Sequence, residues 1–132
     1  GLISLVQLVV SGDAGRAINP LVCRGQDEGS AIMGLTGVLF PCMVYDGATL
    51  MNGNGLDYRV PLATDIPDGF SSVLQEQGHG PGPFGAKSIG EGCMLPVASA
   101  IANAVEDAIG VRIRELPLTP ERVLAAIDEA AE

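Results

Sequence analysis

Large aromatic side chains are scarce in this sequence, which has no Trp, three Phe and two Tyr in 132 residues. Basic residues are scarce as well: 7 Lys and Arg stand against 16 Asp and Glu, for a net charge of -9. Nucleic-acid binding depends on clustered Lys and Arg, so this balance excludes a nucleic-acid partner. No apolar run approaches the ~20 residues that cross a bilayer, and we therefore expect no membrane span.

The cysteines and the single histidine offer little site chemistry. Cys23, Cys42 and Cys93 are odd in number and form no C-x-x-C pair, which fits neither a disulfide framework nor a zinc or iron-sulfur site. We expect three small buried hydrophobic residues in a reducing compartment. Because no basic leader precedes the first apolar run, a cytoplasmic protein is expected. His79 alone cannot build a metal site, so no metal ligand is predicted and a solvated loop position is expected.

The composition that remains is that of a folded chain. Hydrophobic residues make up 47% and charged residues 17%, which excludes the low hydrophobicity and high charge of disordered chains. The length suits one domain over residues 1–132. Apolar content this high, carried mainly by small aliphatic residues, is typical of a surface buried against another chain.

Periodicity and turn signals predict the elements of the first half. Residues 2–10 are rich in β-branched residues and predict a strand, whose hairpin partner is expected before residue 1, and residues 11–15 predict a turn. Asn19 is a favoured N-cap for a helix over 21–40. The four internal glycines of that helix would be justified by close approach of another backbone or a ligand.

The second half begins with a hairpin tip at 45–48, a strand at 70–75 and a long irregular loop at 78–83. The pattern from Met94 then predicts a helix that ends at Gly110.

Two further elements close the chain. The alternation at 111–116 predicts a strand with one solvated face. Thr119 predicts the N-cap of a closing helix over 120–131.

Two local features invite functional interpretation but have ordinary alternatives. The glycine-rich stretch at 78–85 lacks Walker and dinucleotide fingerprints, so a surface loop is expected there rather than a phosphate site. Glu91 stands just before a predicted helix, where a carboxylate favours the positive end of the helix dipole. Position alone therefore predicts helix capping for Glu91.

Five segments carry a resemblance that changes the interpretation of Glu91. They are DAGRAINP at 13–20, RGQDEG at 24–29, LDYRVP at 56–61 with DIP at 65–67, GPFGAKSIGE at 82–91, and LPLTPERV at 116–123. In this order, along nearly the whole chain, they resemble motifs of the molybdenum hydroxylases, the family of xanthine dehydrogenase and aldehyde oxidase. Each segment alone is weak, whereas five in order are specific.

The resemblance implies roles for particular residues. In this family a glutamate deprotonates a molybdenum-bound hydroxide, which attacks an electron-poor carbon while hydride moves to a sulfido ligand, and Glu91 matches that general base. By the same match Gln26 would hydrogen-bond the pterin, although satisfying neighbouring backbone groups is an equally good interpretation of a Gln at the start of a helix. The remaining cofactor-binding residues, which would act through backbone groups, are Lys87, Ser88, Ile89 and Gly90.

The resemblance also implies a fold, a cofactor and partners. The expected fold is α+β, two layers with a mixed sheet and helices on one face, forming half of a molybdenum-cofactor-binding domain. The cofactor would be molybdenum-molybdopterin, in plain or cytosine dinucleotide form, with iron-sulfur and FAD groups on partner chains. The chain would be the C-terminal segment of a molybdenum-dependent oxidoreductase that hydroxylates an aldehyde or N-heterocycle.

The family's catalytic portion is several hundred residues long, so activity would require further chain regions or a larger molybdenum-binding partner chain. Two alternatives stay open: a stand-alone non-catalytic binding module and an inactive fragment that retains the fold.

Overall fold

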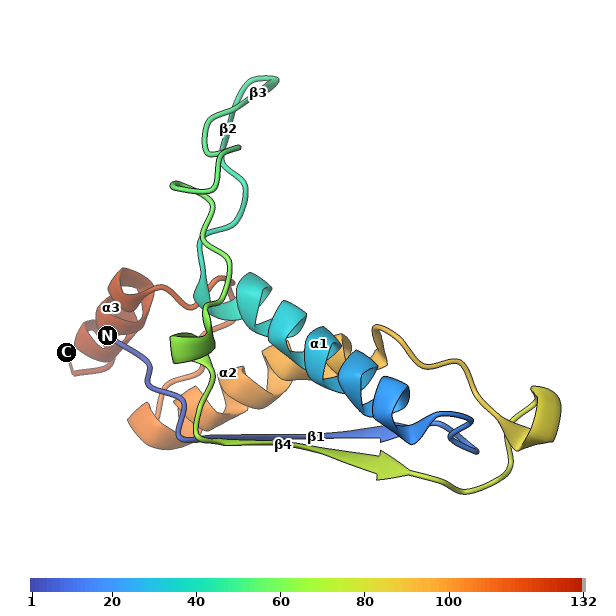
Figure 1. Cartoon of the computed structure of the whole chain (residues 1–132). Helices are drawn as coiled ribbons and strands as arrows, with labels where there is room; N and C mark the ends of the chain where they lie inside the picture. The colour runs from blue at the N-terminus through green and yellow to red at the C-terminus, as the bar shows by residue number, and fades with distance from the viewer. Residues whose placement is uncertain (132) are drawn as a thin grey trace.

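Two parallel strands form one layer of the fold (Figure 1). The computed structural model describes residues 1–131. Strand β1 (Gln7–Asp13) pairs along its length with β4 (Gly69–Gln75). Leu8 and Val10 of β1 are buried while Val9 between them is exposed, which is the two-residue alternation of a strand with one covered face.

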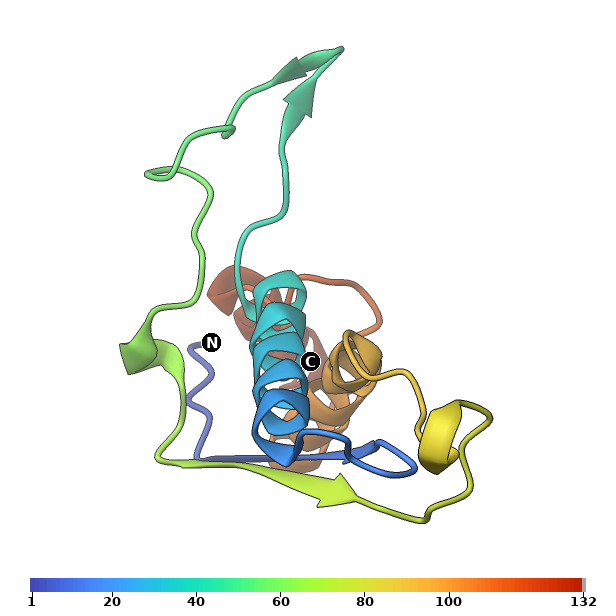
Figure 2. The same cartoon turned by 45° about the vertical axis from the view of Figure 1, so that its right-hand side comes forward.

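Two helices cover that one face. Helix α1 (Pro20–Leu39) and helix α2 (Leu95–Ile109) both lie above the strand pair and pack against each other (Figure 2). The buried core is formed by these two layers, by Cys93 just before α2 and by two residues near the C-terminus; it comprises Leu8, Val10, Ala31, Leu35, Val38, Cys93, Val97, Ile101, Val105, Leu118 and Val123. This arrangement confirms the predicted α+β class with helices on one face.

Local capping explains where α1 begins. The Asn19 side chain accepts a hydrogen bond from the Val22 N-H at 3.2 Å, and Pro20 occupies the first helical position. The predicted helix over 21–40 is therefore confirmed. Of its glycines, Gly34 faces α2, where an added Cβ would lie 2.8 Å from Val97 Cβ. The other three glycines of α1 face open space, so the expected close approach holds at Gly34 only.

A thin arm leaves the two layers after α1 (Figure 1). It carries the hairpin of β2 (Tyr45–Asp46) and β3 (Thr49–Leu50), which confirms the predicted hairpin tip. The buried Asn52 side chain holds the base of the hairpin, since it accepts from the Val44 N-H at 2.8 Å and donates to the Cys42 carbonyl at 2.9 Å. The antiparallel pair and the parallel pair are thus two separate sheets rather than one mixed sheet.

The arm returns to the two layers through the 3-10 helix η1 (Ala63–Asp65), which leads into β4.

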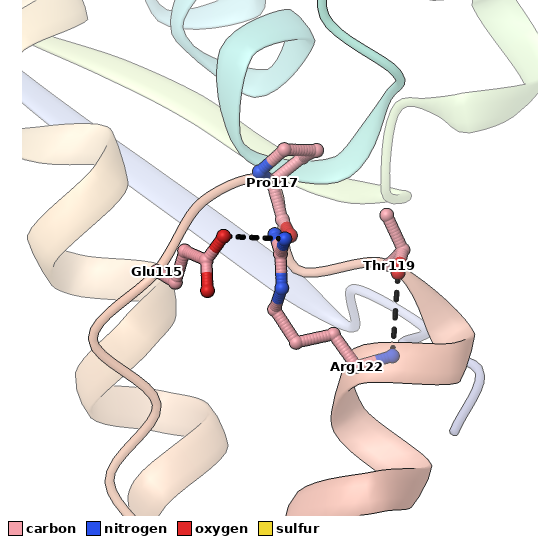
Figure 3. A network of polar contacts seen from close by, with 4 residues as sticks. All are labelled: Glu115, Pro117, Thr119 and Arg122. Carbon is pink, nitrogen blue, oxygen red and sulfur yellow. Dashed lines mark hydrogen bonds and ion pairs between the residues drawn. The ribbon is translucent and has the colours of Figure 1, made fainter.

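The C-terminal region is held by a small polar network (Figure 3). Helix α2 ends at Gly110, which has φ of 75°, as the C-cap prediction required. Helix α3 (Pro120–Ala131) begins after Thr119, whose hydroxyl accepts from the Arg122 N-H at 3.3 Å. The Arg122 guanidinium also donates to Glu115 at 2.8 Å and to the Pro117 carbonyl. The predicted closing helix and its Thr cap are confirmed.

Two strand predictions were wrong. β1 begins at Gln7 rather than Leu2 and extends three residues into the predicted turn, to Asp13, because β4 pairs with it as far as Gln75. Its partner within residues 1–131 is this parallel strand, and the hairpin partner expected before residue 1 lies outside the described residues.

The alternating segment 111–116 forms no strand, since it has no pairing partner among residues 1–131 and Arg112 pairs instead with Glu106 of α2 at 2.6 Å.

Two further observations concern surfaces. Cys23 and Cys93 are buried as expected, but Cys42 is exposed at the start of the arm, so the expectation for it was wrong. None of the helices formed by residues 1–131 has the length and apolar character needed to cross a membrane.

Candidate functional site

The loops that follow β1 and β4 are tied together by backbone hydrogen bonds. The Gly78 N-H donates to the Gly15 carbonyl at 2.8 Å, and the Gly85 carbonyl accepts from Arg16 at 3.0 Å and from Gly80 at 2.8 Å. Gly15 has φ of +61°, and a Cβ there would lie 2.4 Å from the Gly85 carbonyl oxygen. Both the left-handed backbone and the close approach require glycine at position 15. The predicted irregular loop therefore has a defined backbone arrangement.

Lys87 fixes the next segment to the end of β1. Its backbone N-H donates to the Ala14 carbonyl at 2.9 Å, and its ammonium group pairs with the Asp13 carboxylate. Asp13 also accepts the Gly15 N-H at 2.8 Å. The hydrogen bond from Lys87, with a smaller effect of Gly15, holds the pKa of Asp13 below its ordinary value. The chain that leads to Glu91 thus starts from an anchored point.

Ser88, Ile89 and Gly90 line a pocket of about 470 Å³. Its opposite wall is the edge of β1 from Leu8 to Asp13, and the start of α2 completes it. Across residues 1–131, the peptide groups of 88–90 have no backbone hydrogen-bond partner. Three successive peptide units at the rim of a pocket are therefore available to a bound group.

Asp27 and Cys93 form a buried pair at the base of this pocket. The Cys93 thiol donates to Asp27 Oδ1 at 3.3 Å, and Asp27 is only 2% exposed. Burial, followed by the contact with Asp27, raises the pKa of the Cys93 thiol to about 11. Asp27 Oδ2 has no partner within the described part of the chain. Gly12 makes room for the carboxylate, since an added Cβ would lie 2.2 Å from Oδ2.

The sequence contained a signal for Asp27 that the motif comparison did not use. The buried face of α1 includes Cys23, Asp27, Ala31, Leu35 and Val38, at helical spacings of three and four. Extending the apolar face of the predicted helix backwards from Ala31 reaches Asp27 directly. A carboxylate on the core face of a helix is itself a candidate functional group, because burial of an unpaired charge is costly.

Glu91 lies immediately before the 3-10 helix η3 (Gly92–Met94) and is exposed. Its side chain makes no capping hydrogen bond, so the structure gives the capping interpretation no hydrogen-bond support. Gln26 is also exposed, on the first turns of α1. Because its neighbour Asp27 contacts Cys93, the segments that carry Gln26 and Glu91 lie at the same end of the molecule.

The predicted site residues are therefore brought together only in part. Ser88, Ile89 and Gly90 line the pocket, whereas Gln26, Lys87 and Glu91 are not among its lining residues. Within residues 1–131, no three His, Cys, Asp or Glu side chains gather into a group able to hold a metal ion.

Known proteins match this chain over most of its length. The model of the molybdopterin cofactor-binding domain matches residues 1–67. The xanthine dehydrogenase molybdenum-binding subunit of Escherichia coli O157:H7 is 42% identical over 113 residues, which are 84% of this chain and 15% of that subunit. The gamma subunit of the 6-hydroxypseudooxynicotine dehydrogenase complex of Paenarthrobacter nicotinovorans is 37% identical over 125 residues, covering 92% of this chain and 16% of that subunit.

Two solved structures have the same fold over this region. Quinoline 2-oxidoreductase from Pseudomonas putida 86 superposes with a TM-score of 0.81 at 28% identity, over 96% of this chain and 16% of that chain. The aldehyde oxidoreductase of Desulfovibrio desulfuricans superposes with a TM-score of 0.78 at 33% identity, over 93% of this chain and 13% of that chain. This chain therefore spans about one-sixth or less of the proteins it matches.

Proposed function

Because the chain belongs to the molybdenum hydroxylase family of xanthine dehydrogenases and aldehyde oxidoreductases, we propose that it supplies a base and part of a cofactor cradle to a hydroxylase catalytic subunit. The reaction is the insertion of a water-derived oxygen atom into an aldehyde or an N-heterocycle. The observation that supports it most is the hydrogen bond between Cys93 and Asp27, which joins the Gln26 segment to the Glu91 segment.

The residues at 88–90 fit a molybdenum-molybdopterin cofactor, which the family's domain binds. A pterin carries several N-H and carbonyl groups along its edges, and unpaired peptide groups are the partners that such edges require. Ser88, Ile89 and Gly90 would hold it through these groups, and Gln26 through its side-chain amide. Lys87 acts differently, because its N-H already bonds to Ala14; it sets the position of the three residues that follow.

When bound, the cofactor would supply the two-electron oxidation of the substrate carbon. Glu91 would accept the proton of the attacking water-derived oxygen at its carboxylate. A general base must lie within hydrogen-bond reach of the proton it takes, and the Glu91 carboxylate has no hydrogen bond to other groups within residues 1–131. Its proton-accepting atoms are therefore not already occupied.

The test is Glu91→Gln in the catalytic subunit that carries this chain. Loss of a general base lowers turnover by about 10²- to 10⁴-fold, so we expect at least about a 100-fold fall with unchanged molybdenum and pterin content. Glu129→Gln, an exposed Glu on α3, is the matched control and should keep full turnover. Normal turnover by the Glu91 variant would rule out the proposed base.

Partner subunits and location complete the proposal. Relatives are named as subunits, one of them of a dehydrogenase complex, and we expect a larger molybdenum-binding chain as a partner. The electrons taken from the substrate would pass to iron-sulfur and FAD groups on further partner chains. We further propose a cytoplasmic location and a pterin in its plain or its cytosine dinucleotide form. Metal and nucleotide analysis of the purified complex would decide the cofactor form.

A further inference from the structure

The turn that carries Glu91 is attached to α1 through one buried side chain. The Met94 N-H donates to the Glu91 carbonyl at 3.1 Å and closes this turn. Between residues 87 and 97, a stretch that the structure describes in full, Cys93 is the only buried residue. Its thiol donates to Asp27 Oδ1 of α1 at 3.3 Å. Cys93 thus connects the turn of Glu91 to the core.

The two neighbours of Glu91 are glycines that the fold itself does not require. An added Cβ at Gly90 or at Gly92 would meet no atom within 4 Å. Neither glycine has a positive φ. Glycine has more backbone freedom than any other residue, so these two positions leave Glu91 loosely held by its own segment. A fixed position for Glu91 must come from contacts on either side, at Lys87 and at Cys93.

The charge of Asp27 is not explained by stability. The remaining buried residues of α1 are uncharged, namely Cys23, Ser30, Ala31, Gly34, Leu35 and Val38. No Lys or Arg of residues 1–131 forms an ion pair with Asp27. Its Oδ2 has no hydrogen-bond partner in this part of the chain and is enclosed by the chain's own residues, so a group from another region does not reach it. Replacing a buried polar pair by apolar residues is often neutral or stabilising.

A carboxylate does offer one thing that an apolar side chain lacks, a directional acceptor for the Cys93 thiol. The pKa of that thiol is raised to about 11, chiefly by burial, so the thiol stays protonated at neutral pH and can donate. The pair therefore fixes the orientation of Cys93 as well as its depth in the core.

We propose that Asp27 is a positioning residue for the reaction, which acts through Cys93 to hold the turn of Glu91 in its productive place. The proposal rests on the proposed role of Glu91 as the base. A base works only when it is held within a fraction of an ångström of its productive geometry, and misplacement by about 1 Å can cost about 10²-fold in rate.

The test removes both partners of the hydrogen bond at once, in the catalytic subunit that carries this chain. Asp27→Val with Cys93→Ala leaves no buried polar group of the pair unpaired, so the melting temperature should stay equal or rise. We expect kcat to fall by at least about ten-fold, with KM within about two-fold and unchanged molybdenum and pterin content. A merely structural pair would give turnover that follows stability. Cys23→Ala, which removes another buried thiol from the core side of α1, is the matched control and should keep kcat.

Two further measurements show whether the effect passes through Glu91. Cys93→Ser keeps a donor beside Asp27 and should keep kcat within about three-fold of the unaltered subunit. In the Glu91→Gln background, the paired substitution should lower the residual turnover by less than about two-fold, because losses that act through one group do not multiply.

Several results would overturn the proposal. Unaltered kcat in the paired variant would do so, as would an equal fold-loss in the presence and absence of Glu91. Should the paired variant fail to fold, Cys93→Ala and Cys93→Ser are compared, and equal kcat in these two would refute the positioning role. Normal turnover by Glu91→Gln would overturn the proposed function as well, whereas the other results leave it standing, so the two failures can be told apart.

Discussion

Substitution of Gly34 gives a direct test of how α1 and α2 pack. In an open helical position, Gly→Ala stabilises by about 0.5–1 kcal/mol, because Gly loses more backbone freedom on folding. At Gly34, however, the new Cβ would lie 2.8 Å from Val97 Cβ and 2.9 Å from the Met94 carbonyl oxygen. Val97 is 1% exposed and the carbonyl belongs to the backbone, so neither atom can move aside cheaply.

The two contributions can be compared. Overpacking of a closely packed interior costs about 1–3 kcal/mol, which exceeds the gain from replacing glycine. We therefore expect Gly34→Ala to lower the free energy of unfolding by about 1 kcal/mol. Gly29→Ala is the control on the same helix, because an added Cβ there meets no atom within 4 Å. It should raise the free energy of unfolding by up to about 1 kcal/mol.

Urea unfolding followed by far-ultraviolet circular dichroism measures both variants. With a slope of about 2 kcal/mol per molar urea, a separation of about 2 kcal/mol between them appears as a difference of about 1 M in midpoint. The slope itself should stay constant. If Gly34→Ala stabilised the chain as much as Gly29→Ala does, close packing of α1 against α2 at Gly34 would be refuted.

Two other predictions concern titrating groups. The pKa of the buried Cys93 thiol is raised to about 11, so iodoacetamide at pH 8 should label the exposed Cys42 first and leave Cys93 unmodified in the folded chain. Mass spectrometry of the labelled peptides measures both rates. Reaction of Cys93 as fast as Cys42 would contradict the prediction. Lys87→Met should raise the pKa of Asp13, measured by NMR titration of its carboxyl carbon. Because the pKa of Asp13 is lower in the folded chain, Asp13 stabilises the fold above its unfolded pKa, and this stabilisation is lost as pH falls through the folded pKa. Lys87→Met should reduce this pH dependence of stability.

The helices were predictable from the sequence because their signals are local. The Asn19 cap, the Gly110 terminus and the Thr119 cap each lie within a few residues of the helix they delimit, and all three were observed in place. The apolar spacing along each helix also lies within one window. Such elements need no knowledge of the rest of the chain.

The strands were less predictable because their limits depend on distant partners. Residues 2–6 and 111–116 have strand-like composition but no partner among residues 1–131, whereas Ser11, Gly12 and Asp13 are strand residues because β4 runs beside them. Composition gives the tendency of a segment, and the pairing decides its limits.

The motifs name residues of the candidate site but give none of its geometry. The resemblance named residues 88–90, which line the pocket, yet it gave Asp27 no role in the core. Burial of Asp27 depends on the space that Gly12 leaves and on the position of Cys93, far away in the sequence. A tertiary contact of this kind has no local signal apart from the helical spacing.

The surroundings of Glu91 distinguish it from an ordinary surface charge. Four residues before it, Lys87 is fixed to the end of β1 by a backbone hydrogen bond and an ion pair. Two residues after it, Cys93 is buried against Asp27 of α1. Exposed charges that serve solubility need no such fixed position, whereas a base must be held within a fraction of an ångström of its productive geometry. Glu91 is thus an exposed carboxylate between two anchored points, without a capping hydrogen bond of its own, and this fixed position supports its proposed role in proton transfer.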